Sequence, residues 1–215
     1  MNTSSVNLAQ SERALLADLF DKVGPDQPTL NAGWQTSDLL LHLLMRERRP
    51  DAAIGMFVKP FAFWTARVSR GYATLPWTEQ VEMFRTGPKG LSPIRIDAVD
   101  KAMNSGEYLI HHEDVLRGAK NWQPREFDEA TTAVIVKMLT SPPFSWGFRN
   151  HGVGITGRLP DGRPLTLHSG EPHVVLHGAP VELLLWASGR RTECHVRLEG
   201  DPDALATLAK SLAKS

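Results

Sequence analysis

The segment GEYLIHHEDVLRG, residues 106–118, places acids and histidines where a helix should bury apolar side chains. The surrounding pattern predicts a helix that starts near Arg95 and ends at Gly118, since glycine is common just past a helix C-terminus. Its core-facing stripe begins with the apolar residues Ile96, Val99 and Met103. At the same spacing follow Glu107, His111 and Asp114. The buried stripe of this helix therefore changes from apolar to ionisable.

Helical geometry predicts which of these side chains lie together. At about 100° per residue, Glu107 and His111 are about 40° apart, and Asp114 falls close to Glu107 two turns later. His112 is about 100° away from His111 and falls outside this group. Burying an unpaired carboxylate costs several kcal/mol, so the stripe requires a cation, a hydrogen-bond network or a water-filled cleft.

A second histidine has a similar setting, because His42 lies among leucines in DLLLHLLM, residues 38–45. Together with Glu107 and His111 it offers an N, O, N ligand set. Two histidines and one glutamate with an open position are typical of a catalytic divalent metal, and zinc, nickel, cobalt or iron(II) fit. Two alternatives stay open: His42 is a hydrogen-bonded core histidine, or Glu107 and His111 form a solvated helix pair.

Composition narrows the class of protein. The 215 residues carry 24 basic and 24 acidic side chains, a balance that argues against sequence-independent nucleic-acid binding and favours a small-molecule or protein partner. Cys194 is the single cysteine, so an intrachain disulfide is impossible. The segment MNTSSVNLAQSER, residues 1–13, lacks the features of a signal peptide, and no apolar run approaches the roughly 20 residues of a membrane span. We expect a cytoplasmic protein and leave its oligomeric state open.

The pattern of the chain changes from helical to β-rich at Gly152. Helical patterns are predicted at residues 8–23, 37–49, 51–71 (interrupted at Pro60), 78–84, 95–117 and 126–141. Short β-rich runs follow at 152–159, 164–169, 173–178, 181–188 and 193–200, and a last helix begins after Asp201. The sequence thus predicts an α+β protein with a helical domain at residues 1–148 and a small α/β domain at residues 149–215.

The order of apolar and polar residues along the predicted strands indicates two details of the second domain. The run VELLLW, residues 181–186, is apolar on both faces and predicts a central strand. Cys194 alternates with polar residues on the last predicted strand, so we interpret it as a small core residue and not as a nucleophile.

Five segments together resemble a known family. GWQTSDLLLHLL (33–44) and GEYLIHHEDVLR (106–117) resemble two motifs of the DinB-like metal-binding helical bundles, within them the mycothiol-dependent maleylpyruvate isomerase group. The other three are ERALLADLFDKVGPDQPTL (12–30), VVLHGAPVELLLWASGRR (174–191) and VRLEGDPDAL (196–205). The resemblance implies a four-helix bundle with a small C-terminal α/β domain, and it implies that His42, Glu107 and His111 bind the metal.

The resemblance also implies a chemistry. Members use a low-molecular-weight thiol such as mycothiol as the nucleophile, bound to a divalent metal for which zinc is the first candidate. The implied activity is that of a thiol-dependent isomerase or S-transferase acting on an electrophilic small molecule. A non-catalytic metal- or ligand-binding protein and a regulatory module on the same scaffold are the alternatives.

Further residues are candidates for supporting roles. The isomerase of the group uses an arginine from its small domain, and Arg190 or Arg191 is similar in position; a solvated turn arginine is the alternative. Arg46 and Arg49 lie one and two turns after His42 and are candidates for binding carboxylates of the thiol or substrate. Otherwise they belong to an exposed helix end that interacts favourably with the helix dipole.

Asp114 follows His111 by three residues, a spacing that lets a carboxylate orient a ligand histidine. Its alternative role is to neutralise Arg117. His173 and His177 alternate with core residues of a predicted strand, and we assign them no role.

Overall fold

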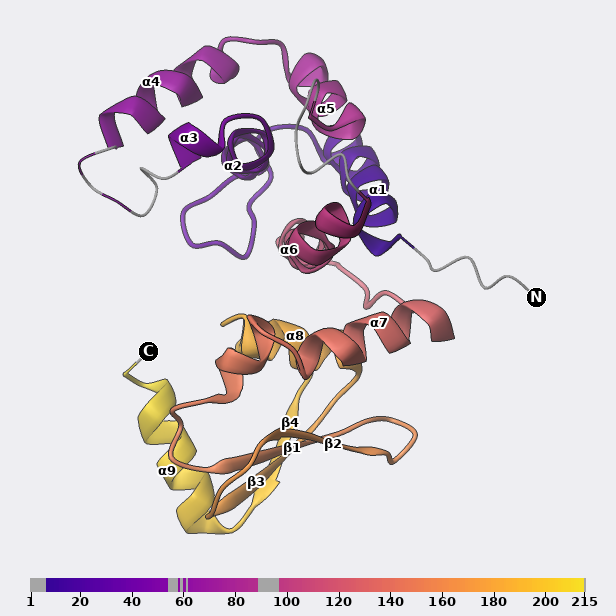
Figure 1. The fold of residues 1–215 in the computed structure, drawn as a ribbon, viewed down its shortest axis with the longest axis vertical. Helices are drawn as coiled ribbons and strands as arrows, with labels where there is room; N and C mark the ends of the chain where they lie inside the picture. Colours follow the sequence, from indigo (N-terminus) through magenta and orange to yellow (C-terminus); the bar gives the residue numbers. More distant parts are fainter. Residues whose placement is uncertain (1–6, 54–57, 59, 61, 89–96, 215) are drawn as a thin grey trace. The chain divides into compact units, whose positions relative to one another are not determined.

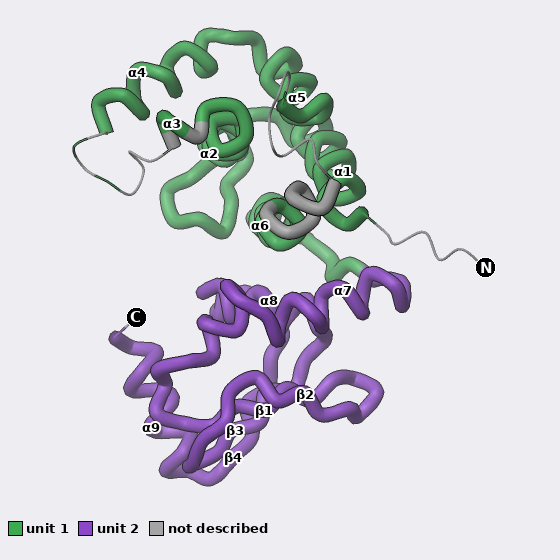
Figure 2. Tube along the Cα trace, in the orientation of Figure 1, with its two compact units in different colours: residues 1–125 green, residues 126–215 purple. Residues whose placement is uncertain are grey.

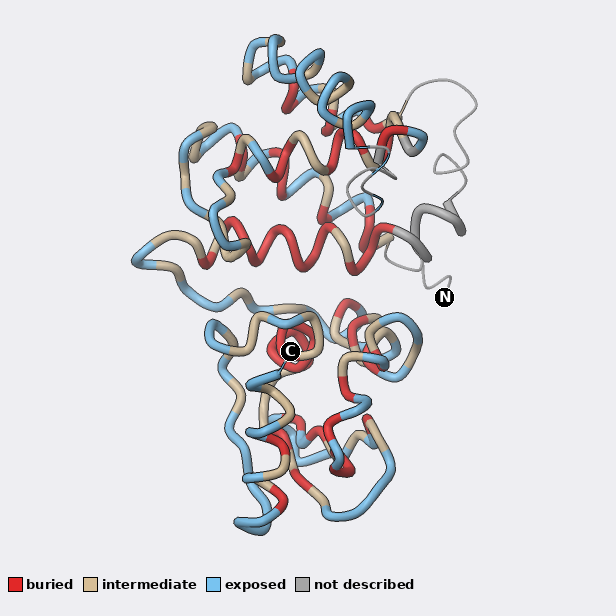
Figure 3. Tube along the Cα trace, turned by 90° about the vertical axis from the view of Figure 1, so that its left-hand side faces the viewer, coloured by how far each residue is buried: buried red, intermediate tan, exposed pale blue. Residues whose placement is uncertain are grey.

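The computed structural model describes residues 7–53, 58, 60, 62–88 and 97–214, without the side chains of 50, 53 and 97–103. Within it the chain forms two compact units, Met1–Arg125 and Glu126–Ser215 (Figure 2). Each unit has its own buried interior (Figure 3). The predicted helix start at Arg95 and the apolar residue Ile96 lie outside the described residues.

Unit 1 is helical among its described residues (Figure 1). Its helices are α1 (Leu8–Val23), α2 (Thr36–Arg48), α3 (Pro50–Ala53), α4 (Ala62–Ala73), α5 (Trp77–Thr86) and α6 (Asp97–Arg117). Four of them, α1, α2, α5 and α6, share one core, which includes Leu16, Phe20, Leu40, Phe84 and Tyr108. The predicted helical bundle is therefore confirmed, and α6 ends one residue before Gly118, as the sequence indicates.

The loop between α1 and α2 is fixed against the C-terminal half of α6. The backbone N–H of Leu30 donates to the carbonyl of Asp114 at 3.0 Å, and the Gln27 side chain donates to the carbonyl of Val115 at 2.9 Å. Gly118 is essential to this packing, because an added Cβ would lie 2.0 Å from the carbonyl oxygen of Pro28. The loop is thus a fixed neighbour of the ionisable stripe on α6.

Unit 2 is built on a four-stranded sheet with the order β2-β1-β3-β4. The strands are β1 (Gly154–Arg158), β2 (Pro164–His168), β3 (His173–His177) and β4 (Arg197–Gly200). β1 pairs antiparallel with β2 and parallel with β3, and β3 pairs antiparallel with β4. The α+β class predicted from the sequence is therefore confirmed.

One predicted strand is wrong, because residues 181–186 form part of α8 (Pro180–Ala187). Pro180 occupies the first helical turn, where its missing N–H costs nothing. The helix is buried nearly all round, and Leu183 packs against Gly157 of β1. An element that is apolar on every face has neither a period of two nor one of 3.6, so the pattern did not distinguish strand from helix.

The last predicted strand is shorter than expected. β4 begins at Arg197, so Cys194 lies before it, half-buried, with its Sγ 3.4 Å from the carbonyl oxygen of Arg191. The predicted C-terminal helix is confirmed as α9 (Pro202–Leu212), with the Asp201 side chain accepting from the N–H of Asp203. Among the described residues, none of the helices has the length and apolar character needed to cross a lipid bilayer.

The compact units divide earlier in the chain than the predicted boundary between residues 148 and 149. Helix α7 (Glu129–Leu139), predicted to close the helical domain, packs on α8 within unit 2, as does the 3₁₀-helix Phe144–Phe148. Ile135 and Leu139 of α7 are buried. A helical pattern shows that a segment is amphipathic but not which core receives its apolar face, and here that core belongs to unit 2.

Gly118→Ala tests the packing of the loop on α6. We expect it to lower the free energy of unfolding by about 1–3 kcal/mol, because the backbone must move to admit the methyl group. The control is Gly71→Ala in α4, where nothing lies within 4 Å of an added Cβ. That change should be neutral or stabilise by about 0.5–1 kcal/mol. Urea denaturation measures both, and equal midpoints for Gly118→Ala and wild type would contradict the close approach.

Candidate metal centre

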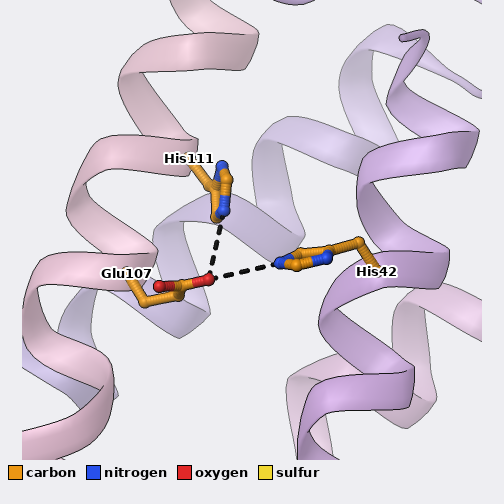
Figure 4. A group of neighbouring side chains, drawn as sticks. All are labelled: His42, Glu107 and His111. Carbon is orange, nitrogen blue, oxygen red and sulfur yellow. Dashed lines mark hydrogen bonds and ion pairs between the residues drawn. The ribbon is translucent and has the colours of Figure 1, made fainter. Parts of the chain in front are cut away.

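Two helices of unit 1 bring three potential metal ligands together. His42 comes from α2, whereas Glu107 and His111 come from successive turns of α6 (Figure 4). The three side chains point toward one another, and one ligand atom from each lies within 4.8 Å of the others. The periodicity of α6 and the position of His42 on α2 thus identified three side chains that meet.

The glutamate is the centre of the cluster. Its Oε1 lies 3.2 Å from Nε2 of His42 and 3.3 Å from Nε2 of His111. The two imidazole rings are 5.4 Å apart between centroids and inclined at 72°. The ring centroid of Trp34 lies 5.5 Å from that of His42, and the two ring planes are inclined at 54°. Exposed fractions of 14%, 29% and 10% for His42, Glu107 and His111 show a site that is mostly enclosed but reachable.

The two separations from Glu107 Oε1, 3.2 and 3.3 Å, fit neighbouring ligands of one tetrahedral ion. Bonds of about 2.0–2.1 Å to nitrogen and oxygen imply neighbouring ligand atoms roughly 3.3 Å apart. Within the part of the chain that the structure describes, no fourth histidine, cysteine, aspartate or glutamate joins the cluster. Three protein ligands with a remaining open position are the arrangement found at catalytic zinc sites, whereas structural sites are closed by four.

Electrostatics hold the glutamate ionised. Burial opposes its ionisation, but hydrogen bonds from His111 and His42, helped by the positive charge of Arg46, lower the pKa of Glu107 well below its usual range. For His111, burial alone would lower the pKa, yet its hydrogen bonds to Asp114 and Glu107 raise it above the ordinary value. The cluster thus attracts a positive charge, either a proton or a metal ion.

Asp114 orients one of the histidines. Its Oδ2, on a fully buried side chain, lies 2.8 Å from Nδ1 of His111. Because this carboxylate accepts the Nδ1 proton, Nε2 is the nitrogen presented to Glu107. Asn31, in the loop between α1 and α2, donates to the same Oδ2 at 3.3 Å. A carboxylate that fixes the tautomer and ring angle of a histidine is a common support for metal ligands.

Of the two arginines predicted to bind carboxylates, Arg46 of α2 approaches the cluster, whereas Arg49, just after α2, does not. Arg46 Nε is 3.5 Å from Glu107 Oε1, and its Nη1 donates to the side chain of Asn104. Arg49 instead forms two hydrogen bonds with Asp51, at 2.9 and 2.7 Å, and lies over the ring of Trp64. Of the two predicted carboxylate-binding residues, the structure brings Arg46 to the cluster.

The comparisons with known proteins cover both units. The family model described as MDMPI C-terminal domain matches residues 127–207. That match begins where unit 2 begins. A crystal structure of the mycothiol-dependent maleylpyruvate isomerase is similar over 90% of both chains, with a TM-score of 0.55 and 19% sequence identity. The resemblance to the mycothiol-dependent maleylpyruvate isomerase group is confirmed.

A histidine-to-alanine variant of that isomerase is similar over the same 90% of both chains, with a TM-score of 0.53 and 16% identity. At such identities, the likeness to the solved isomerases establishes a shared fold and leaves the reaction of this chain open. No curated protein sequence gives a significant match to this chain.

The arginines suggested by the isomerase group lie in unit 2, after α8. Arg190 Nη1 donates to the carbonyl of Ser188 at 2.7 Å. The guanidinium of Arg191 lies 5.0 Å from the ring centroid of Trp186, and burial lowers its pKa. These contacts fix the position of each arginine within unit 2. A role for Arg190 or Arg191 in the reaction is a proposal.

A buried ionic network holds the other side of α6. His112 Nδ1 is 2.9 Å from Glu12 Oε2 of α1, which confirms that His112 points away from the cluster. Arg125 donates to Glu12 at 3.0 Å and to Glu113 at 2.6 Å, and Arg117 donates to Glu113 at 2.7 Å. Buried ions are tolerated when every charge has a partner. The network therefore fixes the rotation of α6 that directs Glu107 and His111 toward α2.

Sequence reasoning missed Asn31 and Trp34. Both belong to the loop before α2. The composition of a loop does not predict which helix the loop packs against. Trp34 stands within the segment that resembles the family motif, so the resemblance carried a signal for it. Asn31 had none, because its hydrogen bond to Asp114 joins residues 83 positions apart.

Asp114→Asn tests the orientation of His111. We expect the affinity for cobalt(II) or zinc to fall by about 10–100-fold, because the amide no longer supplies a charged acceptor for the Nδ1 proton. Competition with a chromophoric chelator measures the affinity, and circular dichroism verifies the fold. Asp51→Asn, which alters an exposed carboxylate of unit 1 in its pair with Arg49, is the control and should leave the affinity unchanged. Unaltered affinity in Asp114→Asn would exclude this role.

Proposed function

We propose that this protein is a metal-dependent enzyme that uses a low-molecular-weight thiol. Its reaction is either the isomerisation of an electrophilic small molecule or the transfer of the thiol to it. Mycothiol or a similar compound is the proposed co-substrate, and zinc is the proposed metal. We place the protein in the cytoplasm, where small thiols stay reduced.

The observation that carries the proposal is the open cluster of His42, Glu107 and His111. A divalent ion bound there supplies Lewis-acid chemistry, which lowers the pKa of a thiol and holds the thiolate beside an electrophile. The similarity to a mycothiol-dependent isomerase agrees with this use of the site.

The side chains of the cluster have separate roles in the proposal. Glu107, ionised at neutral pH, contributes negative charge, and His42 and His111 contribute nitrogen ligands. Asp114 keeps the proton of His111 on Nδ1. Arg46, partly exposed beside Glu107, is the proposed partner for a carboxylate of the thiol or substrate. We assign this role to Arg46 and not to Arg49, because Arg46 lies beside the cluster whereas Arg49 pairs with Asp51 away from it.

The proposal also concerns residues outside the cluster. Arg190 or Arg191 of unit 2 is the proposed catalytic arginine, by similarity to the isomerase group. Cys194 is not the nucleophile, since it is half-buried and its thiol lies against the carbonyl of Arg191. The thiol must therefore come from a co-substrate.

Metal content is the first test. We expect wild type to bind about one equivalent of zinc, and His42→Ala, Glu107→Ala and His111→Ala each to lose it, because each change removes one of three ligands. Plasma mass spectrometry measures the metal, and thermal melting shows whether the variants stay folded. His168→Ala changes a histidine of unit 2 outside the cluster and is the matched control.

The melting result separates the alternatives. An enzyme with an open site should stay folded without its metal, whereas a protein that uses the ion to hold the bundle together should unfold. Absence of metal in the reconstituted wild type would reduce the cluster to a buried polar network and remove the basis of the proposal.

Thiol dependence is the second test. With zinc bound, we expect either maleylpyruvate isomerisation or conjugation of a small aryl electrophile to require mycothiol. Glu107→Gln should lower kcat/KM by about 100-fold or more, because the ligand set loses its charge. Cys194→Ser should leave kcat/KM unchanged. Loss of activity in Cys194→Ser, or full activity without added thiol, would contradict the proposal. Absorbance assays follow both reactions.

A further inference from the structure

A cleft in unit 2 lies outside everything assigned so far. It encloses about 550 Å³ between the turn before β1 and the C-terminal half of α9. Its lining comprises Arg149, Asn150, His151, Gly152, Thr207, Lys210, Ser211 and Lys214. Three of these side chains are cationic at neutral pH, and none of the described lining residues is acidic.

The cations of the cleft are not neutralised. Among the described residues, the side chains of Arg149, Lys210 and Lys214 form no ion pair or hydrogen bond. Other arginines of the chain do pair with acids: Arg85 with Asp18 and Asp21, Arg125 with Glu12 and Glu113, and Arg163 with Asp161. Like charges gathered without counterions repel one another and lower stability, so the arrangement favours an anion that binds there.

The buried side chain of His151 lines the cleft and is held in place by two hydrogen bonds. Nε2 of buried His151 faces the carbonyl oxygen of Gly147 at 3.1 Å, so this nitrogen carries the proton. Nδ1 therefore accepts the hydroxyl hydrogen of Ser211 at 2.8 Å. His151 also contacts the ring of Trp186 edge-on, at 5.6 Å between centroids. The turn and α9 are thereby joined, and the cationic side chains stand at a preformed site.

The turn itself is held in an uncommon conformation. Asn150, with φ of 64°, is the single non-glycine residue with positive φ among those described. Gly152 follows with φ of 71°, and a Cβ there would lie 3.2 Å from the methyl group of Thr207. Asparagine adopts this left-handed conformation more readily than other non-glycine residues, and here it shapes the turn that lines the cleft.

We propose that this cleft binds a phosphate-bearing small molecule. Three cations match the charge and the several acceptor oxygens of a phosphate monoester better than those of a monocarboxylate. The volume suits a phosphate with a small organic substituent. Among the described lining residues there is no Phe, Tyr or Trp, and the ring of His151 is buried against Trp186, which disfavours the base stacking that single-stranded nucleic acids require.

Titration of the full-length protein with glycerol phosphate and inorganic phosphate tests the proposal. Prior removal of metal by a chelator keeps phosphate from binding at His42, Glu107 and His111, so the result is independent of the proposed enzyme function. We expect saturable amide shift changes in two-dimensional NMR spectra, confined to residues 149–152 and 207–214. Lys210→Ala and Arg149→Ala should each weaken binding by about five- to tenfold, through loss of one charge-assisted contact.

Lys137→Ala is the matched control, because it removes one exposed positive charge from α7 of the same unit, outside the cleft. It should leave the affinity unchanged. Equal weakening by Lys137→Ala, no saturable shifts, or the same shifts with chloride at equal ionic strength would overturn the proposal. Phosphatidylcholine vesicles with and without phosphatidic acid form the second arm. Binding to the acidic vesicles without any response to glycerol phosphate would also overturn it, in favour of a lipid headgroup.

Discussion

The carboxylate of Glu107 is the constraint on which unit 1 depends. It lies on the core-facing stripe of α6, and its Oε1 meets the Nε2 atoms of both His42 and His111. A largely enclosed carboxylate needs partners, and here the donating groups that surround its oxygen come from both α2 and α6. The bundle thus contains this polar contact in addition to an apolar core that includes Leu16, Phe20 and Leu40.

This contact forms at only one rotation of α6 about its own axis. Ionisable residues on two sides of the helix stabilise that rotation. Asp114 joins His111 to the loop before α2, whereas His112 and Glu113 join α1 and Arg125 on the other side. The four residues of α6 in these contacts, His111, His112, Glu113 and Asp114, are buried and paired, so turning α6 would leave charges unpaired in the interior. The same network that keeps the helix in place thus supplies a rigid support for the metal ligands.

The candidate sites of the two units favour ligands of opposite charge. The cluster of unit 1 gathers carboxylates and imidazoles and attracts a cation, whereas the cleft of unit 2 gathers Arg149, Lys210 and Lys214 and attracts an anion. A net charge of zero for the whole chain conceals this division. Local charge, and not the sum over the chain, indicates what each unit binds.

The sequence by itself determined the features that depend on neighbouring residues. Helical periodicity placed Glu107, His111 and Asp114 on one face, and alternation located β1, β2 and β3, because backbone geometry fixes these relations locally. Tertiary structure alone decided that residues 181–186 form a helix, that α7 joins unit 2, and that Asn31 contacts Asp114. Each of these segments can pack in several ways. A uniformly apolar run such as residues 181–186, an amphipathic helix such as α7 and a polar loop side chain such as Asn31 all fit more than one neighbour. Which partner each one meets depends on packing between segments far apart in the chain, and local patterns do not encode it.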